Sequence, residues 1–455
     1  MKKKIILGFI TALLISPVFA AYNSWGIPDS SEIRGKLVET WFENTLENVR
    51  SNYQEIYINK AGEKFQVRLE ESDKTFNIFV SPSAENNVKI ISDKEMKTEK
   101  TEVFPGDNAG SWVLIRDKKT GKPVRIRYYF AANSEVYVQF SPHNNTSFAD
   151  LVIFDNYVAK GIPCGVPFSN FYKASFEEVL TITKKILPWN FVTTNKSDYH
   201  AVQQIGAVIA ENLPSILYAH DAMYNDKNEL VKVTNGKAFG ASNVEKDTLY
   251  LSSAGFMKWI ADGLVEPIAG NQLKREPLLT ETVQVKENGY QGVFSTKYNL
   301  FFGLNWIRNL SSAIISVYTG RNYQYAEAGI DVTINPFSGS ISTEGIVNNI
   351  SFVEDSGYTT SVIKSLMYLL AASDPETFYF GAIRGTDRTV TPEIKAFNEC
   401  VVFLPFFDSK GLFNCYVFMN GRKISLDDFC MLYKDDFVYL TKVRASEDFY
   451  PKSVK

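Results

Sequence analysis

The chain has 455 residues, with 48 Lys and Arg against 51 Asp and Glu and a formal net charge of −3 at pH 7. This length allows two or three domains at about 150 residues per domain, and the absence of excess positive charge argues against nucleic acid as the main partner. The 33 Phe and 24 Tyr suit strands with cross-strand pairs, and also surfaces that bind glycans or peptides.

The first twenty residues have the three parts of a secretory signal peptide. Met1 is followed by three lysines, an apolar run extends from Ile5 to Val18, and Ala20 ends the segment. We therefore expect a mature chain that begins at Ala21 and is exported to the periplasm or the exterior as a soluble protein. No later run reaches the roughly 18 to 20 apolar residues that a membrane span needs.

The next segment is predicted to be an amphipathic helix followed by a β-rich domain. A capping signature starts at Pro28, and apolar residues continue from it at helical spacing as far as Val49. From Glu55 to Pro142 the period changes to two, which is typical of strands with one buried face. We expect an antiparallel sandwich or open barrel, so that residues 21–168 form a helix plus β-rich domain. The clearest strands are 65–69, 76–80, 124–130 and 136–140.

Residues 169–455 are predicted to form a second, α+β domain. Its last three strands are expected in one antiparallel sheet, and a hairpin with Cys415 opposite Leu404 would keep Cys415 from pairing with Cys400. Free thiols are therefore expected. The predicted helices are one opened by the Ser175 capping box, 199–210, one opened by Ser252, 305–318 and 359–372, and the predicted strands are 330–334, 377–383, 399–406, 412–418 and 436–444.

The helix opened by Ser252 has the residue pattern most suggestive of a site. Ser252 is of the type that caps helices, and apolar residues follow at helical spacing from Phe256 to Leu264, so one face is buried. Ser253 lies in the first turn, where unpaired N–H groups and the helix dipole favour negative charge. Enzymes often place a nucleophile there, although a capped core helix with purely structural serines explains the same residues.

Residues 252–256, Ser-Ser-Ala-Gly-Phe, resemble the Asp-Cys-Ser-Gly-Phe signature of papain-like cell-wall peptidases of the NlpC kind. Gly255 and Phe256 match outright, while Ser253 stands where the family has its nucleophilic Cys. The resemblance implies a papain-like α+β domain over residues 169–455, with a large insertion at about 270–376.

The resemblance also implies positions for the other two catalytic groups. The base would fall on Asn398 at the start of a late strand, opposite Gly421, and the orienting group on Asn420, so Ser253, Asn398 and Asn420 are the candidate site residues. Asparagine cannot accept a proton near neutral pH, and a serine without a base stays un-ionised. The site is therefore expected to bind a ligand and not to cleave one.

The chain has three histidines, His143, His200 and His220. His220 precedes Asp221, a pair that could act as base and orienter, and an active serine hydrolase using Ser253 with His220 or His200 is one alternative. The sequence contains none of the zinc-protease, nucleotide-binding or α/β-hydrolase motifs, so no cofactor or metal is expected.

The preferred interpretation is an exported envelope protein with an inactive papain-like domain that binds a peptide or a cell-wall fragment. A structural envelope protein without a peptidase-like site is the second alternative. Neither nucleic acid nor a membrane span is expected.

Overall fold

The computed structural model describes residues 26–453, apart from 93–94, 193–198, 241–244, 246, 284–298, 343–344, 348–350 and 389. The predicted signal peptide and Ala21 lie outside the described residues. Among the helices described, none combines the length and apolar character that a membrane crossing requires. The fold is mixed α/β with large antiparallel sheets.

The chain divides into two compact units that do not follow the expected division at residue 168. Residues 107–109, 127–168 and 182–455 form unit 2, and the rest, including 169–181, form unit 1. The segment 127–168 thus belongs with the C-terminal region, and β7 (Pro123–Tyr128) runs across the boundary.

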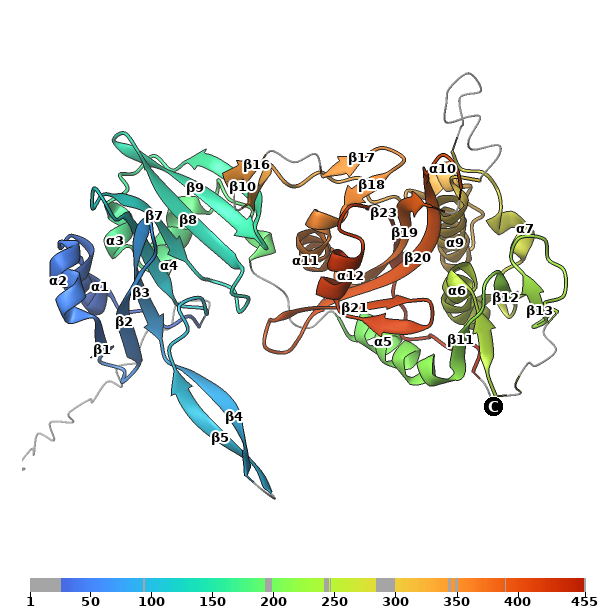
Figure 1. The fold of residues 1–455 in the computed structure, drawn as a ribbon, viewed down its shortest axis with the longest axis horizontal. Helices are drawn as coiled ribbons and strands as arrows, with labels where there is room; N and C mark the ends of the chain where they lie inside the picture. The colour runs from blue at the N-terminus through green and yellow to red at the C-terminus, as the bar shows by residue number, and fades with distance from the viewer. Residues whose placement is uncertain are drawn as a thin grey trace, which may run out of the picture. The chain divides into compact units, whose positions relative to one another are not determined.

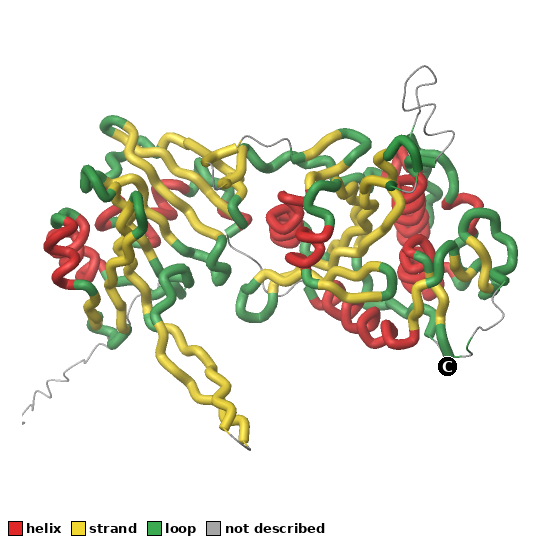
Figure 2. Tube along the Cα trace, in the orientation of Figure 1, coloured by secondary structure: helices red, strands yellow, loops and turns green. Residues whose placement is uncertain are grey.

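Unit 1 contains the antiparallel strands β1, β2, β3 and β6 in that order, together with a long two-stranded hairpin, β4 with β5, that Figure 2 shows. Alternating burial along β2 and β3 confirms the predicted period of two. The elements are α1 (Ser31–Leu37), η1 (Val38–Phe42), α2 (Leu46–Asn52), β1 (Gln54–Ile58), β2 (Lys64–Glu71), β3 (Thr75–Pro82), β4 (Ala84–Ser92), β5 (Glu95–Val103), β6 (Trp112–Asp117), α3 (Asn170–Lys173) and α4 (Phe176–Thr183).

A buried arginine organises the core of unit 1. The Arg34 guanidinium is paired with Asp29 at 2.7 Å and lies 3.7 Å from the centre of the Trp112 ring. The second carboxylate oxygen of Asp29 accepts the N–H of Phe176 at 2.8 Å. One ion pair therefore joins the first helix, the sheet and α4, whose predicted Ser175 capping box is present.

Unit 2 contains most of the helices, strands of two large sheets, and two small two-stranded sheets formed by β11 with β14 and by β12 with β13. Its first strands are β8 (Val136–His143), β9 (Thr146–Ile153), β10 (Asn156–Pro163), β15 (Gly339–Ser342) and β16 (Gly345–Val347). The second sheet has seven strands in the order β17 (Phe352–Val353), β18 (Gly357–Thr359), β23 (Phe437–Arg444), β19 (Thr377–Asp387), β20 (Ile394–Phe407), β21 (Phe413–Met419) and β22 (Arg422–Ile424).

Helices cover both faces of the seven-stranded sheet, α6 and α9 on one and α11 on the other (Figure 1). The predicted late strands do share this sheet, but β19 separates β23 from β20. The remaining elements are η2 (Trp189–Phe191), α5 (His200–Asn212), η3 (Leu213–Ser215), β11 (Ile216–Tyr218), β12 (Ala222–Tyr224), β13 (Leu230–Lys232), β14 (Leu249–Leu251), α6 (Ser253–Ala269), α7 (Arg275–Leu278), α9 (Phe302–Thr319), α10 (Tyr325–Ala328), η4 (Thr360–Val362), α11 (Ile363–Ser373) and α12 (Leu426–Leu432).

Two details of the predicted β structure are wrong. Cys415 pairs with Pro405, and Leu404 with Tyr416, so the hairpin register is one residue away from the expected one. The segment 330–334 contributes a single bridge between Asp331 and Thr441 instead of a strand. All four cysteines are free thiols, as expected.

Candidate functional site

The N-terminus of α6 is built as the sequence predicts. The Ser252 hydroxyl accepts the N–H of Gly255 at 3.1 Å and caps the helix, and it donates to the carbonyl of Ala222 at 3.0 Å. A Cβ atom on Gly255 would lie 2.2 Å from that same carbonyl oxygen, so only glycine allows β12 to approach the helix this closely. The match of Gly255 to the peptidase signature thus has a local packing reason.

The Ser253 hydroxyl is committed to the main chain of β20. It accepts the N–H of Cys400 at 2.6 Å and donates to the carbonyl of Cys400 at 3.3 Å. The β20–β21 pairing ends at Val402 with Phe418, two residues away from Cys400. In an antiparallel strand, residues two apart direct their N–H and C=O groups to the same side, so Cys400 and Val402 face the same way. The Ser253 hydroxyl therefore makes the hydrogen bonds to Cys400 that a longer β21 would have made.

The electrostatics at this contact do not favour a nucleophile. Ser253 is only 9% exposed, and its hydroxyl has a peptide N–H and a peptide C=O as partners, neither of which can take up a proton at neutral pH. Burial raises the pKa of the Cys400 thiol to about 12, so this neighbouring sulfur stays protonated as well. The pair therefore joins helix to sheet and has no activated nucleophile.

Asn398 lies in a bulge of the β19–β20 pairing. Ile383 pairs with Glu399 and Arg384 with Phe397, which leaves Asn398 as the extra residue. Its side chain is exposed, and its amide donates to Asp387 at 3.5 Å. The strand thus presents Cys400 to Ser253, not Asn398.

Asn420 forms the tight turn between β21 and β22 with a backbone φ of 50°. Its side-chain oxygen is buried and has no hydrogen-bond partner among the residues that the structure describes. The next residue, Gly421, packs against Ile216, since a Cβ there would lie 2.9 Å from an Ile216 methyl carbon. The three candidate residues therefore lie in three different local settings, and the hydrogen bonds of Ser253 join it to neither asparagine.

The histidines are occupied elsewhere or exposed. His200 contacts Glu447 at 3.0 Å on the surface, and His220 lies in an exposed turn. The carboxylate of Asp221 accepts the N–H of Thr234 at 2.8 Å and its hydroxyl at 2.7 Å, which fixes the turn. Asp221 thus orients Thr234, and both hydrogen bonds of the Ser253 hydroxyl go to Cys400.

A cleft of about 1260 Å³ lies elsewhere in unit 2, between the end of α6, the segment with α7, and α9. One wall is a single face of α9, at i, i+3, i+4, i+7 and i+8. The residues on that face are Asn309, Ser312, Ala313, Ser316 and Val317. Residues 271–274, 277–278, 280–283 and 322–326 form further parts of the lining.

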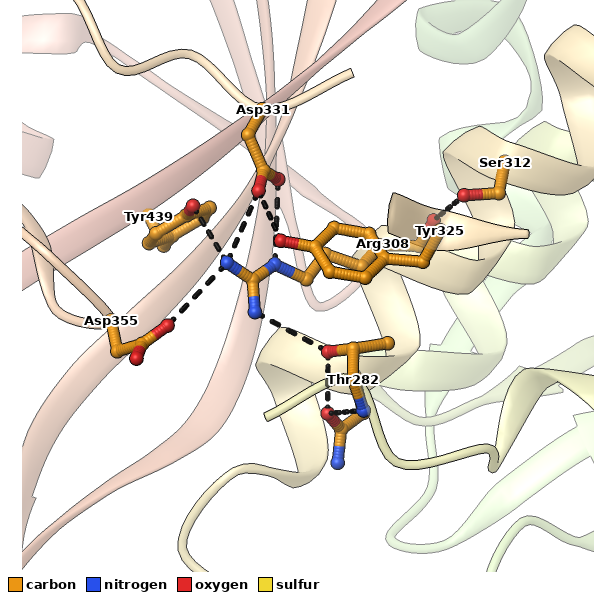
Figure 3. A network of polar contacts seen from close by, with 8 residues as sticks. Thr282, Arg308, Ser312, Tyr325, Asp331, Asp355 and Tyr439 are labelled. Atoms are coloured by element: carbon orange, nitrogen blue, oxygen red, sulfur yellow. Dashed lines mark hydrogen bonds and ion pairs between the residues drawn. The ribbon is translucent and has the colours of Figure 1, made fainter. Parts of the chain in front are cut away.

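A buried polar network stands beside the cleft (Figure 3). Arg308 of α9, 3% exposed, donates to Asp331 at 3.1 and 3.3 Å and to the Tyr439 hydroxyl at 2.7 Å. The Tyr325 hydroxyl donates to the same Asp331 carboxylate. Burial and the hydrogen bond to Asp331 both raise the pKa of Tyr325, so the phenol is neutral.

The same arginine fixes the other side of the cleft. Its guanidinium donates to the Thr282 hydroxyl at 3.3 Å, and Thr282 in turn donates its N–H and its hydroxyl to the Asn305 side chain at 2.9 and 2.7 Å. Both Tyr325 and Thr282 line the cleft. Arg308 therefore holds two of its walls in place.

This cleft was not predicted from the sequence, although a pattern of polar residues in α9 points to it. Asn305, Arg308 and Ser312 recur at helical spacing on a helix whose other buried positions are mostly apolar. Polar side chains on a buried helix face need partners, because an unpaired buried polar group costs free energy. That pattern predicts a network without saying which residues complete it.

In the part of the chain that the structure describes, no group of three or more His, Cys, Asp or Glu side chains is arranged to hold a metal ion. Two comparisons with known proteins give no relative: neither a curated protein nor a solved structure matches the chain. Residues 23–191 match a family model described as a domain of unknown function, DUF8515. The N-terminal part of the chain is thus similar to that family, and the cleft and Ser253 lie outside the matched residues.

Proposed function

We propose that the chain is an exported cell-envelope protein whose C-terminal region binds a peptide or a cell-wall fragment without cleaving it. Export is supported by the basic, apolar and small-residue parts of residues 1–20. A papain-like ancestry of the region is supported by the Ser-Ser-Ala-Gly-Phe segment at the start of a buried helix packed on a sheet.

One observation carries the non-catalytic part of the proposal. The hydroxyl at the nucleophile position both accepts from and donates to the Cys400 peptide groups, so it has no base that could remove its proton. A protein that keeps such a helix and sheet while its serine is structural is better suited to holding a ligand than to hydrolysing one.

The test is a paired binding and cleavage assay. The purified protein is incubated with insoluble peptidoglycan, and the pellet is analysed for bound protein while the supernatant is analysed by chromatography for released fragments. We expect sedimentation with the pellet and no soluble products. Binding to a synthetic stem peptide and to a library of envelope peptides is measured in parallel.

Two results would contradict the proposal. Release of peptidoglycan fragments that disappears in Ser253→Ala would indicate an active hydrolase. Failure to bind peptidoglycan, stem peptide and the envelope peptides would favour a purely structural role in the envelope.

A further inference from the structure

The cleft between α6, α7 and α9 is open to a ligand, unlike the buried N-terminus of α6 where Ser253 lies. Its lining is polar and almost uncharged. Among the described residues that line it, only Lys274 and Glu281 are charged, and they have opposite signs. The wall is dominated by side-chain amides and hydroxyls, with Tyr323 and Tyr325 as the aromatic members. A neutral polar ligand is therefore favoured over a phosphate or a strongly charged peptide.

Three of the amides that line this cleft, on Asn271, Gln272 and Asn309, direct their N–H groups toward the protein. Asn309 donates to the carbonyls of Leu278 at 3.0 Å and Thr280 at 2.7 Å. Asn271 donates to the carbonyl of Ala269 at 3.2 Å. In each case the amide oxygen is left as the group that can face a ligand.

Gln272 shows the same arrangement in a buried setting. Its side-chain N–H groups donate to Asn228 at 3.1 Å and to Glu266 at 3.2 Å. The residue is 9% exposed and lines the cleft. Among the described residues its amide oxygen has no hydrogen-bond partner, but that oxygen is buried and is not accessible to a ligand in the cleft.

The cleft thus offers the amide oxygens of Asn271 and Asn309 as acceptors, while Tyr323, Asn322 and Gln324 bring groups that can donate as well. A peptide main chain brings one N–H donor and one C=O acceptor per residue. A sugar ring brings several hydroxyl donors together with C–H faces that pack on aromatic rings such as Tyr323. The volume of about 1260 Å³ exceeds that of sites for single small molecules, at roughly 300–1000 Å³, and so allows several linked rings.

We propose that this cleft is a binding site for a neutral oligosaccharide, with Asn271 and Asn309 accepting hydrogen bonds from its hydroxyl groups. The inference rests on the proposed binding function and names its ligand class: the glycan part of the cell wall and not the stem peptide. The polar network around Arg308 serves this site by holding Tyr325 and Thr282 in position before the ligand arrives.

The test is calorimetric titration of the full chain with a tetramer of N-acetylglucosamine and, separately, with a synthetic stem peptide. Ala313→Trp fills the cleft from the α9 wall, and Asn271→Ala removes one acceptor from an exposed side chain that the fold does not need. Ala61→Trp, the same substitution at an exposed turn of unit 1, is the matched control. Circular dichroism and thermal melting establish that each variant is folded.

We expect the tetramer to bind the wild type and Ala61→Trp with Kd values within twofold of each other. Ala313→Trp should raise Kd at least tenfold, and Asn271→Ala should raise it at least threefold. Tetramer binding that is equal in all four proteins would place the glycan site elsewhere and overturn the cleft assignment. Binding of the stem peptide alone would overturn the saccharide inference while leaving the proposed binding function intact, and binding of neither probe nor whole peptidoglycan would overturn both.

Discussion

Replacement of Ser253 by alanine distinguishes a structural serine from a catalytic one. The change removes a hydroxyl that accepts the Cys400 N–H at 2.6 Å and donates to the Cys400 carbonyl at 3.3 Å. The short bond contributes most, because without it the buried N–H of Cys400 loses its hydrogen-bond partner. An unmade buried hydrogen bond costs about 1–3 kcal/mol, so we expect the free energy of unfolding of unit 2 to fall by about 2 kcal/mol.

Urea unfolding followed by tryptophan fluorescence measures this change directly. The Trp306 indole donates to the carbonyl of Ala254 at 2.9 Å, one residue from Ser253, so its emission reports on the same helix end. With an m value of about 3 kcal/mol per molar urea, the midpoint should fall by about 0.7 M. The control is Ser361→Ala at an exposed position, where a change within about 0.5 kcal/mol is expected.

The structural interpretation of Ser253 has a clear counter-result. A fluorophosphonate probe should leave the folded wild type unlabelled at this residue. An unchanged unfolding midpoint in Ser253→Ala, together with stoichiometric labelling of the wild type, would refute the reasoning.

Three further predictions concern the packing of unit 2. Arg308→Met should lower its free energy of unfolding by about 3–5 kcal/mol in urea titrations, since it leaves buried partners unpaired, whereas Arg321→Met at an exposed position should change it by less than about 0.5 kcal/mol. Gly255→Ala should destabilise the unit by about 1–3 kcal/mol or prevent folding, because the new Cβ would lie 2.2 Å from a main-chain carbonyl oxygen of β12. Thermal melts measure this change. The control Gly240→Ala, with no atom within 4 Å of the added carbon, should melt like the wild type. Burial raises the pKa of the Cys400 thiol to about 12. The stability that comes from keeping this thiol neutral is therefore present below the ordinary thiol pKa near 8.5 and is lost as the pH rises toward 12. Iodoacetamide at pH 8.5 should modify Cys400 in urea but not in the folded protein, as mass spectrometry would show.

The local elements of this protein follow from its sequence, because their signals lie within a few residues of each other. The Ser252 cap and the reciprocal contacts of Ser175 with Glu178 are present as predicted. Alternation of apolar and polar residues located β2, β3, β7 and β8 in the same way. The strands β4 and β5, with nine residues each, and β9 and β10, with eight each, were not among the predicted strands.

Contacts between distant segments were decided only by the tertiary structure. A shift of one residue in the β20–β21 register and a bulge at Asn398 place Cys400, not an asparagine, against Ser253. The position of one residue in a sheet depends on turn geometry and on neighbouring strands, neither of which a local pattern contains. The partners of Arg308 come from residues 282, 325, 331 and 439. The sequence thus determines that a buried arginine needs acceptors. The tertiary structure determines which ones, because only the folded chain brings segments 17 to 131 residues away to the same guanidinium.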